Sequence, residues 1–102
     1  MVGASAERFV REFRGDYGSI GISGIDEEGN LLDYDYREVA VARTIIECSR
    51  RVLLVTDRSK FGRPAMVRAA HLSAINALLT AGPIDTKWAD LLHEHGVELF
   101  MV

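Results

Sequence analysis

A group of cations and a hydroxyl lies in residues 57–63, which read Asp-Arg-Ser-Lys-Phe-Gly-Arg. The group directly follows the most apolar stretch of the chain, residues 52–56. An arginine can hold an anion such as a phosphate with its planar guanidinium, and a lysine can hold it as a point charge. The three cations, Arg58, Lys60 and Arg63, could therefore form an anion site. The alternative is a basic surface turn that is stabilised by local hydrogen bonds.

Carboxylates at two other places could also contact a ligand. Residues 24–29, Gly-Ile-Asp-Glu-Glu-Gly, put three acids in a turn-rich stretch. One of them could accept hydrogen bonds from ligand hydroxyls, and the alternative is a solvated acidic turn. Glu38 follows Asp35 by three residues, which is the spacing of a helix capping box and explains both residues without a ligand. A carboxylate at the start of a helix could instead orient a ligand hydroxyl or act as a base.

Other reactive side chains do not form a recognisable motif. The sequence spacing puts His93 and His95 on different sides of a helix, and no thiol or carboxylate cluster accompanies them or His71, so we expect no metal site. The single cysteine, Cys48, cannot form an internal disulfide, which fits a reducing compartment. We expect this thiol to be buried and structural, and we expect Trp88 to anchor a helix in the core.

Composition narrows the class of protein. The chain has 102 residues, 48% of them hydrophobic and 26% charged, which suits one α/β domain or a piece of one. A net charge of -3 argues against a general nucleic-acid binder. Charged residues interrupt residues 1–14, and no apolar run is long enough to cross a bilayer. The composition therefore predicts a cytoplasmic domain without a membrane partner.

Hydrophobic periodicity predicts helices alternating with strands. The expected elements are a helix over residues 5–15, a strand over 19–23, a turn-rich stretch over 24–35, a helix from Asp35 to about Ser49, strands over 52–56 and 77–80, a helix from Asp85 to Gly96, and a strand over 97–102. Residues 57–76 carry no clear pattern. This order predicts an α/β fold, an open and mostly parallel sheet with flanking helices.

In such sheets, ligands bind outside the carboxyl ends of the strands. The segments that follow those ends are residues 24–36, 57–64 and 81–85. The first two of these segments contain the candidate carboxylates and the basic group. The expected positions and the expected chemistry therefore agree.

Three sequence blocks resemble the C-terminal part of DeoR-family repressors in order and spacing. They are Gly21-Ile-Ser-Gly-Ile-Asp-Glu-Glu-Gly29, Tyr36-Arg-Glu-Val39 and Asp57-Arg-Ser-Lys-Phe-Gly-Arg63. The resemblance covers roughly residues 9–102. It implies that residues 1–102 are the C-terminal portion of an effector-sensing domain whose fold is similar to ribose-5-phosphate isomerase and coenzyme A transferases.

The resemblance also implies a function. Members of this family bind a phosphorylated metabolite, and this weakens their binding to operator DNA; here a sugar phosphate or glycerol 3-phosphate is expected. By motif, Asp26, Glu38 and Lys60 match the residues that line the family's ligand cleft, and Arg63 would help Lys60 hold the anion. The resemblance implies no cofactor and no catalytic residue. The alternatives are a sugar-phosphate isomerase-like enzyme and a dimerisation module without a ligand.

The chain departs from the family pattern in what it lacks. The DNA-binding domain and the first half of the sensor, with its phosphate-binding loop at a helix N-terminus, have no counterpart in these residues. We therefore expect the chain alone to bind ligand poorly and to contact operator DNA only through the missing domain. We also expect a homo-oligomer, because half of a parallel sheet exposes a strand edge.

Overall fold

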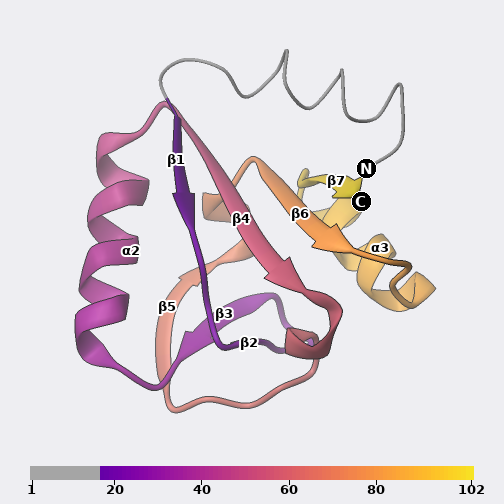
Figure 1. Cartoon of the computed structure of the whole chain (residues 1–102), viewed down its shortest axis with the longest axis horizontal. Coiled ribbons are helices and arrows are strands. Elements are labelled where there is room, and N and C mark those ends of the chain that lie inside the picture. Colours follow the sequence, from indigo (N-terminus) through magenta and orange to yellow (C-terminus); the bar gives the residue numbers. More distant parts are fainter. Residues whose placement is uncertain (1–16) are drawn as a thin grey trace.

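The computed structural model describes residues 17–102, and these form two sheets and two helices. The larger sheet has four parallel strands in the order β1 (Tyr17–Ile20), β4 (Arg51–Asp57), β6 (Ala77–Ala81) and β7 (Glu98–Met101). The smaller sheet is antiparallel and contains β2 (Gly24–Ile25), β3 (Asn30–Asp33) and β5 (Val67–His71). The helices are α2 (Tyr36–Cys48) and α3 (Thr86–Glu94), and two short 3₁₀ turns are η1 (Arg58–Lys60) and η2 (Leu72–Ala74) (Figure 1). The helix expected over residues 5–15 lies outside the described residues.

The parallel sheet has apolar side chains on both faces, as the uninterrupted apolar sequence of β4 predicts. Val52 and Leu54 belong to the main core, which α2, α3 and the smaller sheet cover. Leu53 points to the other face and packs with Ala77 and Phe100. The α/β fold with a mostly parallel sheet is therefore confirmed.

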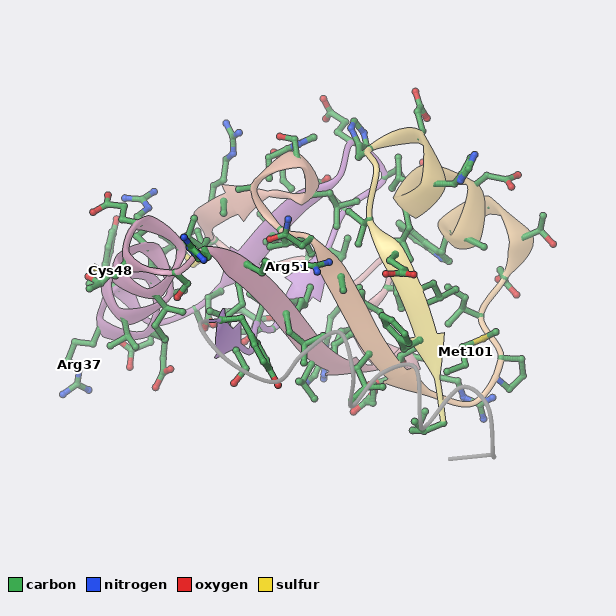
Figure 2. All side chains as sticks on the ribbon, turned by 90° about the horizontal axis from the view of Figure 1, so that it is seen from above. Arg37, Cys48, Arg51 and Met101 are labelled. Carbon is green, nitrogen blue, oxygen red and sulfur yellow. The ribbon has the colours of Figure 1, made fainter. Side chains whose placement is uncertain are left out.

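Helix α2 begins and ends where the sequence predicts. Asp35 is its N-cap and accepts a hydrogen bond from the backbone N–H of Arg37 at 2.8 Å. Val39 and Ala42 are buried on the inner side of the helix. The expectation of a buried thiol is wrong, because Cys48 ends the helix on its exposed side (Figure 2).

Helix α3 buries Trp88 and Leu92, so the predicted role of Trp88 as a core anchor is confirmed. The helix ends in a Schellman motif. The N–H of Gly96 donates to the carbonyl oxygen of His93, and the N–H of Val97 donates to that of Leu92. This motif needs a left-handed residue, and Gly96 has φ +71°. Asp85 lies at the N-cap, but its side chain makes no capping hydrogen bond.

The smaller sheet is the part of the fold that the sequence did not predict. The expected turn-rich stretch over residues 24–35 contains β2 and β3, and the pattern-free stretch contains β5. The strand expected over residues 19–23 instead spans Tyr17–Ile20. These strands are short, and although β2 pairs with the neighbouring β3, the pairing of β3 with β5 joins residues distant in sequence, such as Leu31 and Ala70. Local periodicity cannot reveal such pairings.

An arginine of α2 covers the outer edge of the smaller sheet. Arg43 donates from Nε to the carbonyl oxygen of Ala69 at 3.0 Å and from Nη2 to that of Arg68 at 2.7 Å. Both carbonyls belong to β5, an edge strand. The guanidinium thus satisfies carbonyls that could otherwise pair with another chain.

Strand β1 forms an edge of the larger sheet, since within residues 17–102 it pairs only with β4. Because free strand edges favour association, we expect the chain to form a dimer or a larger assembly. Replacing the exposed Ser19 of β1 with lysine is expected to shift the population towards monomer, whereas Glu47→Lys on α2 should not. Sedimentation velocity at high protein concentration measures this, and a wild-type chain that stays monomeric would contradict the expectation.

Candidate ligand site at the carboxyl ends of the strands

The carboxyl ends of β1, β4 and β6 lie at the same edge of the parallel sheet. Here the chain that follows β1 meets the loop that follows β4. Ile25 forms an isolated parallel bridge with Phe61, and the N–H of Gly62 donates to the carbonyl oxygen of Ile25 at 2.7 Å. The turn between β2 and β3 is therefore held against the basic loop, residues 57–63.

Gly24 makes this contact possible. A Cβ atom at this position would lie 1.9 Å from the carbonyl oxygen of Arg63. Only glycine lets the two backbones approach this closely. Gly24 thus sets the distance between residues 26–29, the acidic turn between β2 and β3, and the basic loop.

The carboxylate of Asp26 is used inside its own turn. Oδ1 accepts hydrogen bonds from the backbone N–H of Glu28 at 3.0 Å and of Asn30 at 2.8 Å, and Oδ2 accepts one from Asn30 Nδ2 at 3.0 Å. Burial alone would raise the pKa of Asp26, but the hydrogen bonds from Asn30, Glu28 and Gly29 outweigh it and hold the pKa below its ordinary value. Asp26 is therefore charged and already hydrogen-bonded.

Asp57 has a similar local role in the basic loop. Its carboxylate accepts hydrogen bonds from the hydroxyl and from the backbone N–H of Ser59. These bonds lower the pKa of Asp57, and the positive charges of Lys60 and Arg63 lower it further. These are the local hydrogen bonds that the alternative interpretation, a basic surface turn, expects, and they fix the shape of the loop that presents the two cations.

Within residues 17–102, the charged ends of Lys60 and Arg63 act on Asp57 only through their charge and form no direct contact with a polar group. Neither side chain forms a hydrogen bond or an ion pair with another residue in the described part of the chain. Lys60 is half-buried at the end of η1, and Arg63 is exposed. Two cations without protein partners at the carboxyl end of β4 could attract an anion.

Glu38 lies elsewhere, on the first turn of α2. It is exposed and lines a hollow of about 220 Å³ with Val41, Ala42 and Ile45 of the same helix and with Ser19–Gly21 at the end of β1. The capping box expected for Glu38 does not form. The N–H of Asp35 instead lies 3.4 Å from Oδ1 of Asp33, so this N–H is directed to Asp33.

The structure thus brings together some of the predicted residues and separates others. The turn of Asp26 lies against the loop of Lys60 and Arg63, while β3 (Asn30–Asp33) runs between this turn and the helix of Glu38. A four-residue strand spans roughly 13 Å. Glu38 therefore lies apart from the Asp26 turn, in a hollow beside the carboxyl end of β1.

Two features of this edge were not predicted as functional. Arg58, Phe61, Asp85 and Trp88 line a second hollow of about 230 Å³, between η1 and the start of α3. Arg58 could have been found from its place in the basic group, but Asp85 is separated from it by 27 positions in the sequence. Asp33 is also buried, and its Oδ1 accepts a hydrogen bond from the hydroxyl of Ser23 at 3.2 Å.

His71 also contacts the acidic turn, and its ring packs against that of His95. His71 accepts at Nδ1 from the N–H of Ser73, so Nε2 can donate to the carbonyl oxygen of Glu28, 2.8 Å away. The ring of His95 packs against His71 edge to face, with centroids 4.7 Å apart. Within residues 17–102, no three His, Cys, Asp or Glu side chains gather as a metal site would require.

The close approach at Gly24 can be tested with a matched pair of glycine variants. Gly24→Ala is expected to lower the free energy of unfolding by about 2 kcal/mol, because its methyl group collides with the backbone of Arg63. Gly21→Ala is the control, since nothing lies within 4 Å of a Cβ built there. Urea unfolding measures both, and equal stability of the two variants would contradict the assigned contact.

The role of Asp26 predicts a pH-dependent stability. Because its pKa is lower in the folded chain, its contribution is fully present above the pKa of an unperturbed aspartate, about 3.9, and is lost as the pH falls through the folded value. Asp26→Asn should lower the free energy of unfolding at pH 7 by about 1 kcal/mol. In urea titrations, the difference from wild type should shrink on acidification. Glu28→Gln is the control and should change little; a pH-independent deficit in Asp26→Asn would refute the assignment.

Comparison with known proteins identifies the family. The model of the DeoR C-terminal sensor domain matches residues 1–81. The chain is 44% identical over 99 residues to the glycerol-3-phosphate regulon repressor of Escherichia coli (strain K12), covering 97% of this chain and 39% of the relative. It is 46% identical over 101 residues to the repressor of the same name from Haemophilus influenzae, covering 99% of this chain and 39% of that protein.

A third relative is more distant. The HTH-type transcriptional repressor CsqR of Escherichia coli is 34% identical over 80 residues, which cover 78% of this chain and 31% of the relative. The chain thus spans about two fifths, 39%, of the length of the regulon repressors that it matches. Neither helix in the described part of the chain has the length and apolarity that a bilayer span requires. The chain belongs to the DeoR C-terminal sensor domain family.

Proposed function

We propose that this chain is the effector-binding part of a transcriptional repressor, and that it binds a phosphorylated small molecule, glycerol 3-phosphate or a sugar phosphate. The observation that carries the proposal is the pair of cations on the basic loop. Lys60 and Arg63 have no partner among residues 17–102, and they follow a strand at the carboxyl edge of a parallel sheet. This edge is where ligands of such folds bind.

The chemistry of the basic loop suits a phosphate. An arginine can donate two parallel hydrogen bonds to phosphate oxygens, and a lysine adds a mobile point charge. Asp57 would oppose an anion, but its charge is directed to the hydroxyl and the N–H of Ser59. The loop therefore presents Lys60 and Arg63 while its own carboxylate is engaged.

The carboxylates would recognise the hydroxyl groups of the ligand. Glu38 has a free carboxylate within the described residues and lines the hollow beside β1. Asp26 already accepts three hydrogen bonds, so we infer that it shapes the turn and offers at most its remaining acceptor capacity to a ligand hydroxyl.

The names of the relatives support both the regulator and the ligand class. Two of them are glycerol-3-phosphate regulon repressors. They are much longer than this chain, of which 97% or more aligns with only 39% of their length. We propose that operator binding and further phosphate contacts belong to segments outside these residues, and that β1 is the edge on which the rest of the sensor sheet adds. The ligand would then act by binding more tightly to the form that leaves the operator.

An isomerase-like enzyme is the alternative function, because the family resemblance implies a fold similar to that of ribose-5-phosphate isomerase. Such an enzyme needs an acid and a base that reach the same substrate atoms. Asp26 is hydrogen-bonded in its turn, and β3 runs between it and the helix of Glu38. This arrangement favours binding over catalysis, and fold alone does not transfer an activity.

A thermal-shift titration tests the proposed function. Glycerol 3-phosphate at millimolar concentration is expected to raise the unfolding midpoint of the chain. A ligand present at ten times its Kd adds about 1.4 kcal/mol to the free energy of unfolding. Inorganic phosphate should not produce this shift. Lys60→Ala should abolish it, and Arg50→Ala should keep it, because Arg50 is an exposed cation outside the basic loop.

Three results would contradict the proposed function. An unchanged midpoint with glycerol 3-phosphate and with every sugar phosphate, for this chain and also for the full-length repressor, would mean that the basic loop holds no effector. A full shift in Lys60→Ala would remove the basic loop from the site. Isomerisation of ribose 5-phosphate by the chain would favour the enzyme instead.

A further inference from the structure

The hollow between η1 and the start of α3 is separate from the residues assigned above to the phosphate ligand. It has a volume of about 230 Å³. Its lining residues are Arg58, Phe61, Pro83, Ile84, Asp85 and Trp88. They come from the loop after β4, the loop after β6 and α3, so two strand ends and a helix form its walls (Figure 1).

Arg58 forms one charged wall. A Cβ atom built on Gly82 would lie 3.6 Å from Nη1 of Arg58, so the guanidinium reaches from η1 to the loop that follows β6. The guanidinium has no hydrogen-bond or ion-pair partner among residues 17–102. Its donors are therefore open to a ligand in this hollow.

Asp85 forms the oppositely charged wall. It lies at the N-cap of α3, but its side chain makes no capping hydrogen bond. It forms no ion pair with Arg58 or with any other cation that the structure describes. A cation and an anion thus line the same hollow without contacting each other.

Two aromatic side chains, Phe61 and Trp88, also line the hollow. The rings of Phe61 and Trp88 pack with centroids 5.3 Å apart, and Trp88 is 6% exposed. The nearby cation Lys87 is occupied elsewhere, because its ammonium bonds Glu27 at 3.1 Å and lies 5.0 Å from the Trp88 ring. Lys87 and Glu27 line a different hollow on α3. The hollow of Arg58 therefore has one positive and one negative side chain.

We propose that this hollow binds a small zwitterion of the α-amino acid type, whose carboxylate contacts Arg58 and whose ammonium contacts Asp85. A simple anion such as phosphate would be attracted by Arg58 and repelled by Asp85, whereas a zwitterion complements both charges. The volume lies below the roughly 300–1,000 Å³ of sites for drug-sized ligands, so the ligand has few heavy atoms. The proposal does not rest on the proposed function, since both the ligand and the residues differ.

The test uses the fluorescence of Trp88, the single tryptophan of the chain, together with calorimetry. L-Alanine carries both charges, propionate carries only the negative one and ethylamine only the positive one. L-Alanine is expected to change the fluorescence saturably, and propionate and ethylamine should each bind at least about tenfold more weakly. No response to L-alanine at 100 mM (about the weakest binding worth measuring), or propionate binding as well as L-alanine, would overturn the proposal.

Two variants separate the contributions of the charges. Arg58→Gln and Asp85→Asn should each weaken L-alanine binding about tenfold or more, since each removes a charge-assisted contact. The two variants should also change the relative affinity for propionate and ethylamine in opposite directions. Arg58→Gln should bind ethylamine more tightly than propionate, and Asp85→Asn should bind propionate more tightly than ethylamine. A loss of stability alone would not produce opposite ligand preferences in the two variants.

Charge-matched controls come from α2 and its C-terminal end. Arg50→Gln and Glu47→Gln remove an exposed cation and an exposed anion that do not line the hollow, and both should bind L-alanine as wild type does. Equal weakening in these controls would mean that net charge, not the hollow, governs binding. The proposal would also fail if both hollow variants bound L-alanine normally.

Discussion

The candidate site depends on a close contact between two backbones, that of Gly24 and that of Arg63. A single methyl group at Gly24 would collide with the Arg63 carbonyl. Next to it, Ile25 forms a bridge with Phe61 and accepts a hydrogen bond from Gly62. This junction fastens the smaller sheet to the carboxyl edge of the parallel sheet. Without it, the acidic turn and the basic loop would be independent surface turns.

The charged groups at this edge divide into two kinds. Asp26 and Asp57 accept local hydrogen bonds, which lower the pKa of each carboxyl. These hydrogen bonds fix the shapes of the two loops. Glu38, Lys60 and Arg63 have no partners within the described chain. A site that must bind a charged metabolite reversibly needs both kinds, because free charges are useful only on loops of defined shape.

The acidic turn is also held by residues outside the basic loop. Glu27 pairs with Lys87 of α3, and the carbonyl oxygen of Glu28 contacts Nε2 of His71 at the end of β5. Trp88 lies between two hollows of α3, one lined by Glu27 and one by Arg58. Helix α3 thus connects the turn with the loop after β4.

The sequence by itself determined the parallel sheet and its helices. The apolar run of β4, the cap at Asp35 and the stop at Gly96 are local signals, and the structure places β4, α2 and α3 accordingly. The basic group was also visible, since its charges are adjacent in the chain. Only the tertiary structure decided which residues share a site. It added the distant strand β5 to the β2–β3 pair, put Asp26 beside the basic loop and Glu38 beyond β3, and brought Arg58 and Asp85 to one hollow. Those contacts depend on long-range pairing, which local periodicity does not encode.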